Sequence, residues 1–318
     1  MSPSNRSTSG DWPDIPFTAW SDTAATLHMW TQVVGKVRLA RTPWTNHSWH
    51  VPLYVTGRGL GTSLIPYDGR AFEIDFDLLG HRLVVQVTDG ARESLPLEAR
   101  PVADFYRDVI EMLAALALDV RIHTTPSEVP NGIPFEDDTQ HRHYDREFAT
   151  RFWRALVQID RVFKEFRSRF IGKCSPVHFF WGSFDLAVTR FSGREAPPHP
   201  GGIPNFPDWV AREAYSHEVS SAGFWPGGGG GIDHPAFYSY AYPTPPRFAA
   251  AGVSPAAAHY STELGEFVLS YDDVRQAESP DEVLLQFLQT TYEAAAATAD
   301  WDRAALEREL IRPGGSRS

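Results

Sequence analysis

The residues of this sequence best suited to chemistry are polar side chains inside aromatic segments of its second half. His178, Asp185 and Arg190 interrupt the otherwise apolar run 177–191. An extended strand there would place His178 and Arg190 on one face and Asp185 on the other. Because an unpaired Asp or Arg in a buried strand costs several kcal/mol, we expect these side chains either to form ion pairs or to line a wetted cavity.

A metal centre is one interpretation of these residues. His178 and His217 come from different segments and would supply two imidazoles, and Asp185, Glu213 or Glu218 would supply a carboxylate. Two histidines and one carboxylate form the ligand set of non-haem iron sites, and the same side chains bind zinc. Iron or zinc is therefore the cofactor expected under this interpretation, although the chain has no HExxH motif.

The local structure of Glu213 decides whether it can join His217. On a strand the two residues share a face but lie about 13 Å apart, at roughly 3.3 Å per residue, which is too far to bind one ion. On a helix the same spacing brings the side chains together. Pro207 could open a short helix that includes Glu213, so both alternatives stay open.

Acid–base catalysis without a metal is the second interpretation. His217 would act as the general base, oriented by Glu218 or Glu213. Tyrosines alternate along 238–242 and would present hydroxyl groups on one strand face, although such a series also suits core packing. The candidate catalytic residues are His217, Glu218, Tyr240 and Arg190.

The overall charge of the chain limits its partners. The 318 residues include 29 Lys and Arg against 40 Asp and Glu, a formal net charge of −11. Because nucleic acid and anionic membranes need a positive protein surface, we expect neither as a partner and expect a small-molecule ligand instead. The start of the chain lacks a signal-peptide pattern, and the single cysteine excludes an internal disulfide, so we expect a cytoplasmic protein.

The hydrophobic patterns predict an α+β fold in which antiparallel sheets are flanked by helices. A helix, several strands and a helix follow one another twice, and the segment 32–38 resembles 158–164, so we expect an internal duplication; two unrelated halves are the alternative. The expected helices are 22–40, 101–116, 148–170 and 280–292. The expected strands are 50–56, 62–65, 72–78, 81–87, 177–191, 213–224, 236–242 and 266–269.

These patterns also predict the division of the chain. The predicted parts are an N-terminal tail 1–20, a first unit 21–125, a Pro- and acid-rich connector 126–147, a second unit 148–300 with an insertion 193–212, and a C-terminal helix and tail 301–318. The glycine run Gly227–Gly231 lacks the Lys-Ser/Thr of a phosphate-binding loop. It indicates a turn, and a mobile lid is the alternative.

Four segments carry a family resemblance: WTQVVGKVRLA (30–40), VADFYRDV (102–109), HFFWGSFDLAVTRFSGR (178–194) and REAYSHEVSSAGFWPGGGG (212–230). Together they resemble a bacterial family known as a domain of unknown function, over nearly the whole chain. The resemblance implies no activity, cofactor or catalytic residue. From the residues we therefore expect a small-molecule enzyme with its site in the second unit; the alternative is a non-catalytic ligand-binding or scaffold protein.

Overall fold

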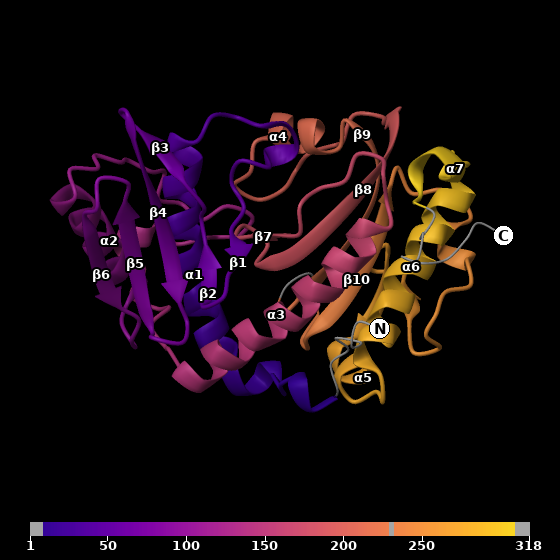
Figure 1. Cartoon of the computed structure of the whole chain (residues 1–318), viewed down its shortest axis with the longest axis horizontal. Helices are drawn as coiled ribbons and strands as arrows, with labels where there is room; N and C mark the ends of the chain where they lie inside the picture. The colour runs from indigo at the N-terminus through magenta and orange to yellow at the C-terminus, as the bar shows by residue number, and fades with distance from the viewer. Residues whose placement is uncertain (1–8, 229–231, 309–318) are drawn as a thin grey trace, which may run out of the picture.

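The described part of the chain forms two antiparallel sheets and seven α-helices, so the predicted α+β class is confirmed (Figure 1). The computed structural model describes residues 9–228 and 232–308. Each sheet has six strands, in the orders β1-β2-β4-β5-β6, with β3 paired to β4, and β11-β12-β10-β9-β8-β7. Because the two strand orders differ, they do not confirm the internal duplication, which stays a prediction.

The first sheet owes its form to strict alternation of apolar and polar residues. Phe72, Ile74 and Phe76 of β4 are fully buried, whereas the acidic residues between them are half-buried. Its strands are β1 (Tyr54–Val55), β2 (Gly59–Gly61), β3 (Ile65–Tyr67), β4 (Arg70–Asp77), β5 (Arg82–Val87) and β6 (Arg92–Pro96). The helices beside it are α1 (Phe17–Arg41) and α2 (Val102–Ala115). The predicted hairpin at 72–87 is therefore confirmed, and the first helix begins earlier than expected.

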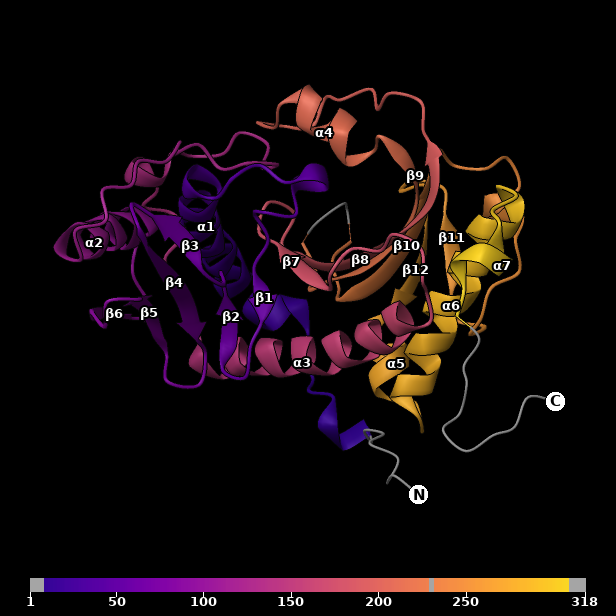
Figure 2. The ribbon, with the colours of Figure 1, turned by 45° about the horizontal axis from the view of Figure 1, so that its top comes forward.

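The second sheet is covered on one face by helices that cross it (Figure 2). Its strands are β7 (His178–Phe180), β8 (Asp185–Glu195), β9 (His217–Trp225), β10 (Ala236–Tyr242), β11 (His259–Ser261) and β12 (Glu266–Ser270). The helices of this half are α3 (Arg146–Ser168), α4 (Asp208–Ala214), α5 (Tyr271–Arg275), α6 (Pro280–Thr298) and α7 (Arg303–Leu306). The helices α3 and α6 contact the sheet, and α4 lies on the opposite side. This leaves the second face of the sheet free to form a site.

The segment 177–191 is a hairpin and not the single strand expected from its sequence. A turn at 181–184 separates β7 from β8, and Phe184 in that turn has a positive φ of 57°. The register pairs His178 with Ala187. Because opposite residues share a face, His178 lies on the same face as Asp185, whereas Arg190 lies on the other. The expected distribution of these polar residues over the two faces is therefore wrong.

The two sheets are joined through the backbone and the core. Leu53, next to β1, exchanges two hydrogen bonds of 2.8 Å with Phe179 of β7. One hydrophobic cluster also contains buried residues from both halves of the chain. The predicted division into two units stays a prediction, and most of the glycine run 227–231 lies outside the described residues. No helix within the described ranges is long and apolar enough to cross a membrane.

Arg190 belongs to the core between the second sheet and its helices. Its side chain is 1% exposed, and its guanidinium carbon lies 3.5 Å from the ring centroid of Phe166 and 4.3 Å from that of Tyr292. The guanidinium donates a hydrogen bond to the carbonyl oxygen of Phe166. This position satisfies a buried cation by cation–π contact, and it places Arg190 on the face of the sheet opposite Tyr240.

Replacing Arg190 by Ala is expected to lower the free energy of unfolding by about 2–5 kcal/mol, as for other large buried side chains. The control is Arg58→Ala, because Arg58 is 62% exposed and pairs with Asp77 at the surface. That change should cost less than about 1 kcal/mol. Urea unfolding measures both variants, and equal losses would contradict the structural role of Arg190.

Candidate functional site

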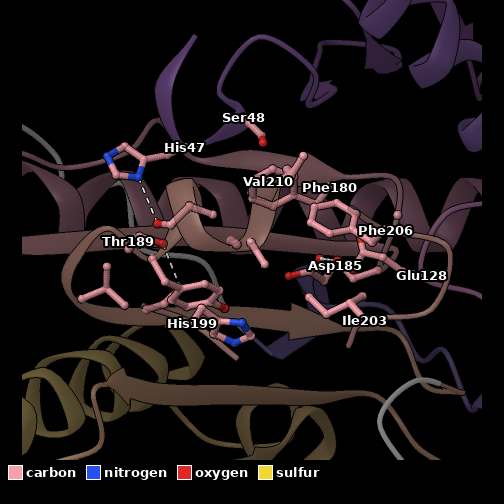
Figure 3. Close-up of a pocket in the computed structure, with 18 of the residues that line it drawn as sticks. His47, Ser48, Glu128, Phe180, Asp185, Thr189, His199, Ile203, Phe206 and Val210 are labelled. Carbon is pink, nitrogen blue, oxygen red and sulfur yellow. Dashed lines mark hydrogen bonds between the residues drawn. The ribbon is translucent and has the colours of Figure 1, made fainter. Parts of the chain in front are cut away.

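A cavity of about 700 Å³ lies on the face of the second sheet opposite α3 and α6 (Figure 3). Side chains of β8, β9 and β10 line it, and Thr189 pairs with Ser221, which pairs with Tyr240. The helix α4, which lies across from α3 (Figure 2), and the loop before it contribute further lining residues. A cavity of this size fits a small organic molecule.

Asp185 is the central polar group of this cavity. Its carboxylate accepts hydrogen bonds from the hydroxyl groups of Tyr238 and Ser183, and the residue is 3% exposed. Burial raises its pKa to about 6, although both hydrogen bonds act in the opposite direction. A carboxyl group with this pKa exchanges protons near neutral pH.

Gly223 allows Tyr238 to reach Asp185. A Cβ atom at Gly223 would lie 2.2 Å from the Tyr238 hydroxyl oxygen, so the phenol ring occupies the space above this glycine. Gly223 stands opposite both Ala187 and Tyr238 in the sheet. Small residues on β8 and β9 therefore let the tyrosine of β10 extend across two strands.

Glu128 adds a second carboxyl group from the loop that precedes α3 (Figure 3). Its carboxyl packs on Gly182, where a Cβ atom would lie 2.0 Å from Oε1. The side chain of Gln32 in α1 fixes the loop, because its Oε1 accepts from the backbone N–H of Ser127 at 2.9 Å and its Nε2 donates to the Ser127 carbonyl at 2.8 Å. Burial raises the pKa of Glu128 to about 7, and the charge of Asp185 raises it too.

Glu266 is the third carboxyl group and stands at the start of β12. Burial raises its pKa to about 8, with a further contribution from Asp185. Its Oε2 is buried and makes no hydrogen bond to any described residue. At pH 7 Asp185 is therefore mostly ionised and Glu266 mostly protonated, so one cavity holds both a proton acceptor and a proton donor.

The structure does not gather the four predicted metal ligands. Glu213 belongs to α4, and its Oε1 accepts a hydrogen bond of 2.7 Å from Trp44 Nε1. His217 lies beside Ser216 and is not a lining residue, whereas His178 and Asp185 both line the cavity. Across residues 9–228 and 232–308, no group of three His, Cys, Asp or Glu side chains could hold a metal ion. The donor set expected for iron or zinc is thus not assembled.

The predicted catalytic residues are also separated. Tyr240 lines the cavity, and its hydroxyl lies 2.8 Å from that of Tyr215. Glu218 follows His217 on β9, so their side chains point to opposite faces of the sheet. Glu218 instead accepts a hydrogen bond of 2.7 Å from Arg194. Glu218 therefore does not orient His217, and Arg190 lies in the core described above.

Sequence reasoning missed Glu128 and Glu266. Glu128 falls in a proline-rich connector, where no periodicity relates it to the strands. Glu266 is the first residue of a short apolar strand and looks like an ordinary strand end. Glu266 shares one sequence signal with Asp185: each is an acidic residue at the border of a buried apolar segment.

Gly223→Ala should displace Tyr238 and break its hydrogen bond to Asp185. Because that bond lowers the pKa of Asp185, the pKa should then rise above about 6. Tyr238→Phe should raise it in the same direction without the steric change. Carboxyl ¹³C chemical shifts followed across a pH titration measure both effects. An unchanged pKa in both variants would contradict the assigned hydrogen bond.

Stability should fall with rising pH because of Glu266. Its pKa is about 8 in the fold against 4.5 for an unperturbed glutamate, so the stabilisation is complete below pH 4.5 and is lost as pH rises through 8. Glu266→Gln should make the protein more stable than the wild type near pH 8, by up to about 1.4 kcal/mol per pKa unit. The urea midpoints of the wild type and of Glu266→Gln, measured near pH 4.5 and near pH 8, test this prediction. Glu263→Gln, on an exposed turn, should change neither midpoint.

Comparison with known proteins gives a family for the chain. No curated protein and no solved structure matches it. The profile of DUF5996, described as a family of unknown function, matches residues 12–308. This range contains both sheets and every cavity residue named above, and the resemblance expected from the four sequence segments is thereby confirmed. The chain belongs to the DUF5996 family.

Proposed function

We propose that this protein is a small-molecule enzyme that uses acid–base chemistry in the cavity of the second sheet, with Asp185 as the group that accepts a proton. The observation that carries the proposal is the buried Asp185 carboxylate, held by Tyr238 and Ser183 at a cavity of about 700 Å³. A general base works best when its pKa lies near the working pH, and that of Asp185 is about 6.

Glu266 would complete the proton transfer. When a substrate gives a proton to Asp185, the protonated carboxyl of Glu266 can give one to another substrate atom, so the number of protons is balanced. Isomerisation and dehydration reactions require one group that accepts a proton and another that donates one. Tyr238 acts as a positioning residue that holds the carboxylate, and the aromatic lining limits the access of water.

Non-catalytic ligand binding is the second candidate function. Both hydrogen-bond donors to Asp185 belong to the protein itself, which also suits a carboxylate with a structural role. In that case the cavity would bind a small molecule without changing it. The single cysteine, Cys174, supports a cytoplasmic location for either function.

Solvent deuterium exchange separates the two functions for any substrate that loses a proton from carbon. Metabolites that raise the melting temperature of the protein are first selected, and each is then incubated with it in D₂O and followed by NMR. A proton acceptor in the cavity should introduce deuterium into at least one bound compound. Asp185→Asn should slow this exchange by about 10²-fold or more while binding persists.

The matched control for this assay is Glu263→Gln, an exposed carboxyl outside the cavity lining. It should exchange deuterium at the wild-type rate. Exchange that is as fast in Asp185→Asn as in the wild type would rule out Asp185 as the base. Compounds that bind but neither exchange nor react would favour the non-catalytic function.

A further inference from the structure

The charges of the cavity lining have one sign. Three carboxyl groups line it, and none of its lining residues in the described chain is Lys or Arg. Basic side chains lie behind lining residues: Lys36 Nζ donates to Ser127 Oγ at 3.1 Å, Lys173 Nζ lies 2.6 Å from His47 Nε2, and the charge of Arg38 acts on His178. A bound anion would therefore meet carboxylates with no cation in the lining to offset them, whereas a bound cation would be matched.

Aromatic rings form much of the remaining lining. The rings of Trp225 and Tyr238 are 4.3 Å apart, and Tyr240 stacks beside Tyr238 at 6.1 Å. Trp44 and Trp209 line the cavity too, are 41% and 54% exposed, and lie 4.6 Å apart, so they stand at its opening. The negative faces of such rings attract organic cations, and tryptophan does so most strongly.

Buried polar atoms in the lining also lack partners. His178 is 1% exposed, and neither of its ring nitrogens makes a hydrogen bond to a described residue. Burial lowers its pKa to about 3, so the ring is neutral and offers one acceptor and one donor. Glu266 Oε2 is a second buried acceptor that makes no hydrogen bond to a described residue. His178 is on β7 and Glu266 on β12, with three strands between them, so separate polar groups of a ligand would satisfy the two acceptors, which would otherwise cost stability.

We propose that the ligand of this cavity is an organic cation, an amine or ammonium compound with an apolar portion that packs on the aromatic rings. The inference rests on the proposed function, because it names the substrate class of the same site. The carboxyl groups would neutralise the ammonium group, and Trp44 and Trp209 would contact the compound as it enters.

Binding of a cation should release protons. A positive charge beside Asp185 and Glu128 favours their ionised forms, so affinity should increase as pH rises through about 6 to 7. Glu266, whose pKa is about 8, keeps the proton that the proposed reaction uses. Burial lowers the pKa values of His47, His178 and His199 and raises those of Tyr215, Tyr238 and Tyr240, which favours the neutral form of each group in this range. Basic groups behind the lining are Lys36, Arg38 and Lys173.

Three probes of similar shape and different charge test the inference: phenethylammonium, phenethyl alcohol and phenylacetate. Titration calorimetry at neutral pH should show phenethylammonium binding at least about tenfold more tightly than the alcohol, a difference of about 1.4 kcal/mol, with phenylacetate weakest. Repeating the titration in two buffers of different ionisation enthalpy counts the protons, and net release is expected for the cation alone.

Charge variants connect this preference to the named carboxyl groups. Asp185→Asn should weaken phenethylammonium about tenfold and leave phenethyl alcohol unchanged, and Glu263→Gln should change neither. If Asp185→Asn unfolds at too low a temperature for titration, Glu128→Gln replaces it. This variant removes a charge from the loop side of the cavity and should also weaken phenethylammonium binding. Equal binding of the alcohol or of phenylacetate, no proton release, or no saturable binding of the cation would each overturn the inference.

The deuterium-exchange assay keeps the two proposals distinguishable. Exchange that depends on Asp185 but occurs in a neutral or anionic compound would support the enzyme and overturn the cation preference. Cations that bind with proton release, while no bound compound exchanges or reacts, would support the cation preference and overturn the enzyme.

Discussion

Burial of three carboxyl groups in one aromatic cavity is the constraint on which the second sheet depends. Desolvation opposes their charges and raises the pKa values of Asp185, Glu128 and Glu266 to about 6, 7 and 8. Hydrogen bonds from Tyr238 and Ser183 offset part of this cost for Asp185. The two glutamates lack such donors among the described residues and are held nearer to neutrality. Hydrogen bonding therefore contributes to the lower pKa of Asp185 relative to the two glutamates.

The first helix holds two segments of the site in place. Gln32 holds the loop that carries Glu128, and Trp181, in the turn between β7 and β8, packs on Gly35, where a Cβ atom would lie 2.3 Å from the indole. His28 Nε2 lies 2.9 Å from the carbonyl oxygen of Gly182 in the same turn. Two segments of the cavity are thus positioned by residues about 95 and 150 positions earlier in the chain. The cavity consequently requires the two halves to be folded together.

The sequence was informative where local periodicity decides the structure. Alternation in β4 and the helical stripe of α3 are local patterns, and both elements form as expected. The turn at 181–184 was missed because aromatic residues continue through it, and this error reversed the face assigned to His178. Asp185 and Tyr240 could be found, because polar groups in apolar strands are costly. Glu128 could not, since contacts distant in sequence fix its loop.

Desolvation also explains why carboxyl groups, and not histidines, became the candidates for proton transfer. In water an imidazole titrates near neutral pH and a carboxyl group far below it, so a sequence favours histidine for this chemistry. Burial destabilises the charged form of each group, which lowers the pKa of a histidine and raises that of an acid. In this cavity the pKa of His178 falls to about 3 while that of Asp185 rises to about 6. The same dry environment thus turns His178 into a neutral hydrogen-bonding group and makes Asp185 the group that can exchange protons.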